Sequence, residues 1–253
     1  MNKIYFYKWI KHDGSIMIGV KNLSVSFPGK VVIDDVSFQV NQGETVVIMG
    51  KNGSGKSVLL KSIAGLIDEY KGEIQIDGTD IRELFKNTAD TSKKEVRDCI
   101  MAYVFQKGGL FDSVNVFDNA AFGLRRMGVP EDEISERVKS ALERVGLKGA
   151  ESKLPSELSG GMQKRAGIAR AVCMKPGVIL YDDPTAGLDP ILSDSIADLM
   201  LEIKSSLNTA SIIVTNDLKV ARKTADRIAL LYSGRFVTFM ETEDFFSETD
   251  HYS

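Results

Sequence analysis

Gly50-Lys51-Asn52-Gly53-Ser54-Gly55-Lys56-Ser57 matches G-x-x-x-x-G-K-[ST], the pattern of a phosphate-binding loop, and it decides the fold. Its three glycines let the backbone curl, so that N–H groups and the positive end of the following helix face phosphate oxygens. Lys56 adds a positive charge toward the outer phosphates, and Ser57 supplies a hydroxyl ligand for Mg²⁺. The stretch therefore predicts a phosphate site between a strand and a helix.

The residues around this loop supply that strand and that helix. Residues 45–49 form an apolar strand-like run before the loop, and residues 58–64 predict a helix that stops at Gly65. Further strands between turn residues are expected at 23–27, 31–40 and 72–76. Residues 80–98 are polar and aperiodic, so they predict a solvated loop.

The second half of the chain alternates between strands and helices after a helical stretch. Residues 116–172 are helical in pattern, and the spacing of Ile134, Val138, Leu142 and Val145 is typical of a face that packs on a core. Buried strands are then expected at 178–181 and 211–215, with a helix at 191–207 between them. Such alternation predicts an α/β fold with a parallel sheet, flanking helices and a helical insert.

Composition limits the possible functions. The 253 residues are 43% hydrophobic and 26% charged with a net charge of -3, which fits one large globular domain and disfavours a nucleic-acid partner. Cys99 and Cys173 form no C-x-x-C pattern, so neither a metal site nor a disulfide is expected. The sequence has no apolar run of about 18 to 20 residues and no signal-peptide pattern. We therefore expect a cytoplasmic protein, with docking on a membrane protein left open.

A second phosphate-binding element follows in the stretch Leu158-Ser159-Gly160-Gly161-Met162-Gln163. A serine and two glycines at the start of a helix expose N–H groups to an anion. Two such elements in one chain suggest that one of them serves a neighbour's nucleotide. Asp182 is the candidate magnesium ligand. It follows an apolar run, and a carboxylate at the carboxyl end of a buried strand beside the phosphate loop is suited to bind Mg²⁺.

Taken together, residues 50–57, Gln106, 158–163, 178–189 and 215–217 resemble the ATP-binding subunit of an ABC transporter, in the family's order and over nearly the whole chain. The resemblance implies an α/β fold of the P-loop NTPase (RecA-like) type, with a parallel-sheet core, an antiparallel β subdomain and a helical insert. It divides the chain into an N-terminal tail (1–18) and a single ATPase domain (19–253). Within that domain the core covers 19–110 and 173–253, and the helical subdomain covers about 111–172.

The resemblance also assigns roles to individual residues. ATP would be bound by Phe27, Gly50, Lys51, Asn52, Gly53, Ser54, Gly55, Lys56, Ser57, Val58, Ser159, Gly160 and Gly161. Mg²⁺ would be held by Ser57, Gln106 and Asp182, and catalysis would involve Asp183, Gln106 and Asn216. Phe27 would stack on adenine, although a core position in a strand is the alternative. Ser159 to Gly161 would contact the γ-phosphate of a second, head-to-tail protomer, and residues 186–189 would form a dimer contact.

Two of the residues that the resemblance assigns to catalysis depart from the family pattern. Asp183 stands where the family has Glu to polarise the attacking water, and Asn216 stands where it has His to contact the γ-phosphate. Asp withdraws the carboxylate by about 1.5 Å, and a misplacement near 1 Å costs on the order of a hundredfold in rate. Three interpretations follow: slow hydrolysis with Asp183 as the general base, a degenerate subunit that pairs with a competent ATPase, or a homodimer that hardly turns over.

One segment indicates which class of substrate is transported. Residues 104–119 resemble the ATPases of Mla-type lipid transporters, which work with MCE-domain proteins. The resemblance implies a second ATPase protomer, an integral membrane permease and an MCE-domain lipid-binding protein as partners, with the chain peripheral on the cytoplasmic face of the inner or plasma membrane. Importers of amino acids or other small solutes are the alternative. A soluble role in DNA repair or on the ribosome is disfavoured, because the chain has neither a long coiled-coil insert nor two ATPase halves.

Overall fold

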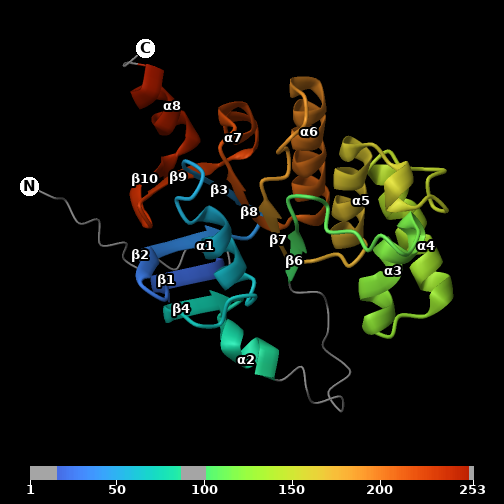
Figure 1. Ribbon diagram of the computed structural model, residues 1–253, viewed down its shortest axis with the longest axis horizontal. Coiled ribbons are helices and arrows are strands. Elements are labelled where there is room, and N and C mark those ends of the chain that lie inside the picture. Colours follow the sequence, from blue (N-terminus) through green and yellow to red (C-terminus); the bar gives the residue numbers. More distant parts are fainter. Residues whose placement is uncertain (1–15, 87–100, 251–253) are drawn as a thin grey trace, which may run out of the picture.

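The computed structural model describes residues 16–86 and 101–250, which form two sheets and their covering helices (Figure 1). The strands are β1 (Ile16–Phe27), β2 (Lys30–Asn41), β3 (Thr45–Met49), β4 (Lys71–Ile76), β5 (Thr79–Asp80), β6 (Met101–Val104), β7 (Val178–Asp182), β8 (Ala210–Thr215), β9 (Arg227–Tyr232) and β10 (Arg235–Glu241). The helices are α1 (Lys56–Ile63), α2 (Ile81–Lys86), α3 (Val116–Arg126), α4 (Glu131–Arg144), α5 (Gly160–Val172), α6 (Pro190–Leu207), α7 (Leu218–Thr224) and α8 (Thr242–Asp250).

The larger sheet has the order β10-β9-β3-β8-β7-β6 among the described strands. Neighbours from β9 to β6 are parallel, and β10 is an antiparallel edge. Every residue of β3, β7 and β8 is buried, as the continuous apolar runs predict for strands covered on both faces. Met49 pairs with Thr215 and Asp182 with Val214, so the carboxyl ends of these three strands meet at one edge. Ligands of parallel α/β sheets bind at that edge.

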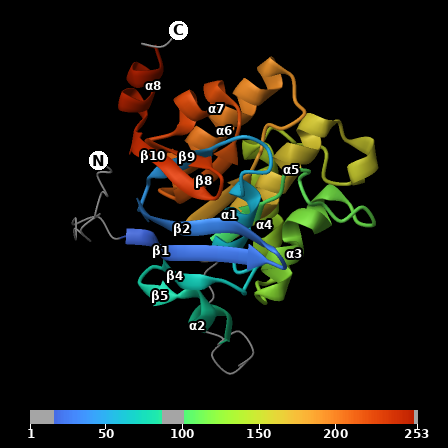
Figure 2. The same ribbon diagram turned by 60° about the vertical axis from the view of Figure 1, so that its left-hand side comes forward.

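The smaller sheet is antiparallel, with the order β2-β1-β4-β5 (Figure 2). The turn between β9 and β10 fixes it to the larger sheet, because Asp34 N donates to Gly234 O at 2.9 Å and Arg235 pairs with the Asp34 carboxylate at 2.6 Å. Ile33 and Ile74 of this sheet share a hydrophobic core with Leu60 of α1. The antiparallel sheet therefore lies directly against the helix that follows the phosphate loop.

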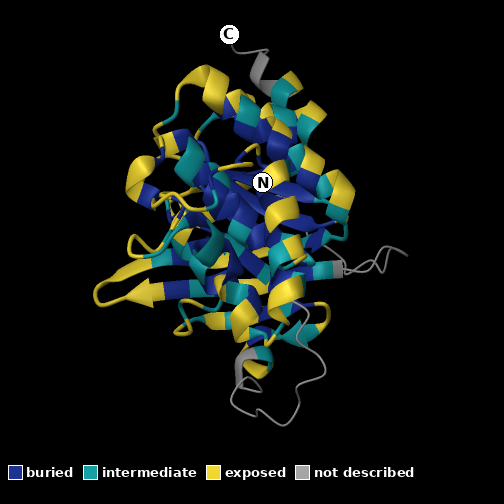
Figure 3. Ribbon diagram, turned by 90° about the vertical axis from the view of Figure 1, so that its right-hand side faces the viewer, coloured by how far each residue is buried: buried dark blue, intermediate teal, exposed yellow. Residues whose placement is uncertain are grey.

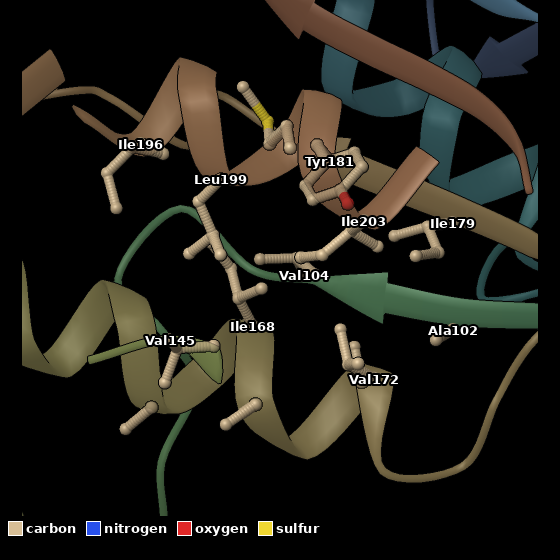
Figure 4. Packing of buried hydrophobic residues seen from close by; sticks show 14 of the residues in the cluster. Ala102, Val104, Val145, Ile168, Val172, Ile179, Tyr181, Ile196, Leu199 and Ile203 are labelled. Carbon is tan, nitrogen blue, oxygen red and sulfur yellow. The ribbon is translucent and has the colours of Figure 1, made fainter. Parts of the chain in front are cut away.

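Helices α3, α4 and α5 form the helical insert and pack on one another at one side of the larger sheet (Figure 1). The predicted stripe Ile134, Val138, Leu142 and Val145 is fully buried, so its core-facing role is confirmed. Figure 4 shows the cluster in which α5 and α6 meet β6 and β7, with Val145 at its margin. Figure 3 shows the buried residues in the interior of the molecule and the exposed residues on the outer faces of the helices and in the loops. Among the described residues, no helix combines the length and apolar composition required to cross a bilayer.

Two expectations for irregular segments need correction. Residues 79–86 form the short strand β5 and helix α2 rather than a solvated loop, because Ile81 is buried and Leu84 packs on the same core. The rest of that predicted loop, residues 87–98, lies outside the described residues. Strand β1 begins at Ile16, within the stretch assigned to the tail.

The Cys173 thiol is buried and donates to Ala169 O at 2.9 Å, as a small core residue would. Cys99 and the two histidines, His12 and His251, lie outside the described residues, as does the tail at 1–15.

Candidate nucleotide-binding site

The phosphate loop connects β3 to α1 and depends on close backbone contact. Gly55 begins α1 with a φ of +107°, and a Cβ there would lie 2.8 Å from Ile33 Cδ1 and 2.9 Å from Val32 O. A Cβ on Gly50 would lie 2.4 Å from Leu231 O. Only glycine fits these two positions, because both the backbone angle and the space exclude a side chain. The loop is thus fixed between the antiparallel sheet and the β9–β10 turn.

Polar groups in the loop fit a polyphosphate. The Lys56 ammonium donates to Gly50 O at 2.6 Å and to Lys51 O at 3.1 Å. Burial lowers the pKa of Lys56, an effect that the carboxylates of Asp183 and Asp182 oppose. Within the described part of the chain, the Ser54 hydroxyl is buried without a hydrogen-bond partner. A buried hydroxyl of this kind, next to an ammonium and the start of a helix, suits an anion with several oxygens.

Two oxygens at the end of β7 and the start of α1 fit a magnesium ion. Ser57 Oγ donates to Asp182 Oδ1 at 2.8 Å. Neighbouring ligands of octahedral Mg²⁺ lie about 3 Å apart, so this pair has the required spacing and chemistry. Tyr103 of β6 donates its hydroxyl to Asp182 Oδ2 at 2.7 Å, and burial raises the pKa of that tyrosine. Tyr103 thereby orients the Asp182 carboxylate.

The structure places Asp183 and Gln106 together, at the edge where the strands end. Gln106 Nε2 lies 3.5 Å from Asp183 Oδ2, and Thr215 Oγ1 donates to Asp183 Oδ1 at 3.2 Å. Asp183 N donates to Val214 O at 2.9 Å, and its φ is +46°. Burial raises the pKa of Asp183, although the Thr215 hydrogen bond and the charges of Lys164 and Lys56 oppose this effect.

Three residues of this cluster were not predicted from the sequence. Tyr103 lies in β6, a strand that the residues themselves did not predict. Thr215 ends the strand expected at 211–215, but no contact was assigned to its side chain. Lys164 lies in the second turn of α5, where a charged residue looks solvent-exposed, yet it is buried and its Nζ lies 3.5 Å from Asp183 O. The sequence signal that could have pointed to these contacts was the predicted parallel sheet, because parallel strands end at the same edge and bring their last residues close together.

Two predicted residues lie at the exposed margin of the site. Phe27 ends β1 with 45% of its surface exposed, so the alternative that it is a core residue is wrong. Asn216 is exposed immediately after β8, and Asp217 accepts hydrogen bonds from Lys219 N and Val220 N as the N-cap of α7. Both side chains are therefore available to a bound molecule.

The second phosphate-binding element does not join this cluster within one chain. Ser159 is the N-cap of α5, and its hydroxyl accepts from Met162 N at 3.4 Å. Ser159 and Gly160 are exposed, and the hydrogen bonds of Ser159 stay within its own helix. In Figure 1, α5 belongs to the helical insert, whereas α1 covers the other part of the sheet.

Comparison with known proteins agrees with this arrangement. The family model described as ABC transporter matches residues 33–186. The solved structure of cbiO1 from Clostridium perfringens, part of the ABC transporter complex cbiONQ, has a TM-score of 0.80 and 30% identity, and the match covers 94% of this chain and 93% of that one. The fold is therefore that of an ABC ATPase subunit, with the parallel core and antiparallel sheet of P-loop NTPases.

Sequence relatives carry different names. The chain is 40% identical over 227 residues to the probable ribonucleotide transport ATP-binding protein mkl of Mycobacterium leprae, which covers 88% of this chain but 63% of that protein. It is 37% identical over 235 residues to the intermembrane phospholipid transport system ATP-binding protein MlaF of Haemophilus influenzae, which covers 92% of this chain and 87% of that one. The family model and the match to MlaF show that this chain belongs to the ABC transporter family of ATP-binding proteins.

Proposed function

We propose that this chain binds ATP·Mg²⁺ and hydrolyses it to power a membrane transporter. The observation that carries the proposal is the cluster at the carboxyl edge of the sheet, where Ser57, Asp182 and Asp183 lie beside the phosphate loop. Lys56 and the loop amides would bind the phosphates, and Ser57 and Asp182 would hold Mg²⁺. A bound Mg²⁺ would neutralise charge on the phosphate oxygens.

Asp183 is the proposed general base. Its carboxylate lies between Thr215 and Gln106, so it can accept a proton from a water that Gln106 also orients. The shorter Asp side chain and the neutral Asn216 predict slow turnover rather than none. A degenerate role in a mixed ATPase dimer is the second candidate, and the same two residues favour it.

The working unit in this proposal is a head-to-tail dimer. Ser159 and Gly160 are exposed at the N-terminus of α5, where main-chain N–H groups can meet the γ-phosphate held by another protomer. ATP would then lie in the interface, and its binding would favour the closed dimer. Hydrolysis would release that closure and move an attached permease.

Complementation tests this composite site. Lys56→Ala removes phosphate binding, and Gly160→Glu blocks the surface offered to the partner, so each pure variant should be inactive. In a mixed dimer, the Gly160→Glu protomer supplies an intact phosphate loop and the Lys56→Ala protomer supplies an intact Gly160 surface. These two halves form one working site, and the second site of the dimer carries both substitutions. An equal mixture should therefore recover about a quarter of the wild-type turnover. No recovery, in samples that still dimerise, would contradict the composite site.

We infer that the transported substrate is lipid, carried by an Mla-type system that includes an MCE-domain protein. Support comes from the match to MlaF and from residues 104–119, which run from the end of β6 into the first turn of α3. There, buried Asn119 bonds Phe111 through both its amide oxygen and nitrogen. Phe111 is 44% exposed, and its ring lies 4.8 Å from that of exposed Phe122. This fixed aromatic pair offers a docking surface for a membrane subunit.

A small-solute importer is the alternative, because the mkl relative is named for ribonucleotide transport. Purification of the chain from its own cells with its membrane subunits distinguishes the two. Phospholipid bound to the complex, an MCE-domain protein in it and ATP-dependent transfer of labelled phospholipid would support the lipid assignment. ATP-dependent uptake of an amino acid or nucleoside in its place would overturn it.

A further inference from the structure

Lys164 carries a buried charge that the proposed chemistry does not use. It lies in α5 with 7% of its surface exposed, although charged side chains are rarely buried without a partner. Its Nζ donates to the main-chain oxygen of Asp183 at 3.5 Å. Burial lowers the pKa of Lys164, and the Asp183 carboxylate opposes that effect. The ammonium is therefore directed at the residue proposed as the general base.

The main chain at Asp183 needs such support. Its φ of +46° lies in the left-handed region, which Asp tolerates but most residues avoid. Its N–H is held by Val214 O, and its carbonyl oxygen accepts from both Ala186 N and the Lys164 ammonium. Because these bonds fix the peptide on either side of Cα, they also determine where the carboxylate points.

The helix that carries Lys164 also touches the loop after Gln106. A Cβ on Gly108 would lie 2.7 Å from Gln163 O, and Arg170 donates to Gly109 O at 2.6 Å. Helix α5 thus contacts the loop that follows Gln106, at Gly108 and Gly109, and reaches Asp183 through Lys164.

We propose that Lys164 is a positioning residue for ATP hydrolysis, which holds Asp183 in place and ties it to the helix that meets the partner's ATP. The proposal rests on the proposed function, because it takes Asp183 as the general base. A shift of α5 on dimer closure would move the ammonium relative to Asp183. Each protomer would then align its own base only when its helix α5 has engaged the neighbour's nucleotide.

Substitutions at Lys164 separate positioning from packing. Lys164→Met keeps the length and removes the charge, Lys164→Gln keeps a donor, and Lys164→Arg keeps both charge and donor. Lys148→Met on an exposed loop is the matched control for loss of a lysine. The purified chain is assayed for phosphate release at varied ATP, and its melting temperature is recorded.

We expect Lys164→Met and Lys164→Gln to lower kcat by about tenfold or more, with KM changed less than about twofold, because a 1 Å misplacement is costly. Lys164→Arg should restore kcat to within about threefold, since it retains the charge. The melting temperature of Lys164→Met should be equal or higher, because an apolar side chain replaces a buried charge. Lys148→Met should behave as the wild type.

The inference is overturned by wild-type turnover in Lys164→Met, or by parallel losses of kcat and melting temperature that Lys164→Arg does not restore. Asp183→Asn distinguishes this failure from failure of the proposed function. Full turnover in Asp183→Asn would remove Asp183 as the base. An inactive Asp183→Asn beside a fully active Lys164→Met would leave the base in place and remove Lys164 alone.

Discussion

Replacing Asp183 with Glu and Asn216 with His together should raise ATP turnover. The Asp183 carboxylate is drawn back to Thr215 at 3.2 Å and lies 3.5 Å from Gln106 Nε2, at the limit of a hydrogen bond. One added methylene lengthens the side chain by about 1.5 Å. A correction near 1 Å is worth on the order of a hundredfold in rate, or about 2.7 kcal/mol of activation free energy.

Asn216 adds the second part of this prediction. It is exposed after β8, so an imidazole there enters open space rather than the core. His can donate a hydrogen bond as a neutral ring or carry a positive charge toward a phosphate, which Asn cannot. We expect Asp183→Glu alone to supply most of the increase and Asn216→His to add less than tenfold.

Phosphate release by the purified chain at saturating ATP·Mg²⁺ measures this effect, and equilibrium ATP binding accompanies it. Asp183→Asn is the control that removes the base. Turnover of the double variant at or below the wild-type value, with ATP affinity intact, would refute the claim that these two residues limit the chemistry. That result would favour a subunit whose hydrolysis depends on a different partner chain.

Three further predictions concern stability and metal affinity. Gly167→Ala should lower the free energy of unfolding by about 1 to 3 kcal/mol in urea, because its Cβ would lie 2.6 Å from a main-chain oxygen, whereas Gly123→Ala meets only a movable methionine side chain and should cost less. Asp183→Asn should raise the melting temperature near pH 7. Burial raises the pKa of the Asp183 carboxyl, so the wild-type fold loses stability as pH rises through the folded pKa and this carboxyl ionises. The gain should vanish below about pH 4, where the carboxyl is protonated in both the folded and the unfolded state. Tyr103→Phe should raise the Mg²⁺ concentration for half-maximal turnover about tenfold through loss of its hydrogen bond to the β7 carboxylate, while Tyr232→Phe at an exposed position should not.

The fold was predictable because its signals are local and repeated. The glycines of the phosphate loop, the apolar run 178–181 and the stripe from Ile134 to Val145 each indicate an element through composition and spacing alone. Helix α2 was missed because six residues, with Ile81, Leu84 and Phe85 as the apolar ones, are too short a stretch to reveal a helical period beside a polar segment. Its helix is stabilised by packing on the antiparallel sheet, which is a tertiary effect.

The site was predictable where a motif carries its own chemistry and unpredictable where chemistry depends on distant neighbours. Ser57 and Asp182 are far apart in the sequence, yet both were expected, since each follows its own strand to the same edge. Tyr103 and Lys164 were missed because their roles come from atoms that only the fold brings near, the Asp182 carboxylate and the Asp183 carbonyl. A buried lysine cannot be told from an exposed one in a helix without knowledge of what covers it.

Asp183 contacts three different parts of the fold. Thr215 ties its carboxylate to β8, Gln106 approaches from the loop after β6, and Lys164 reaches its carbonyl from α5. Two of these contacts, at 3.5 Å, have room to shorten, whereas every residue of β8 is buried. If closure of the proposed dimer shifts α5, which contacts the loop after β6, it would tighten the two longer contacts around a carboxylate that Thr215 already holds. With the proposed base, an Asp at this position would make hydrolysis depend more strongly on closure than a Glu would, because the shorter side chain would have to be brought to the water by movement of the main chain.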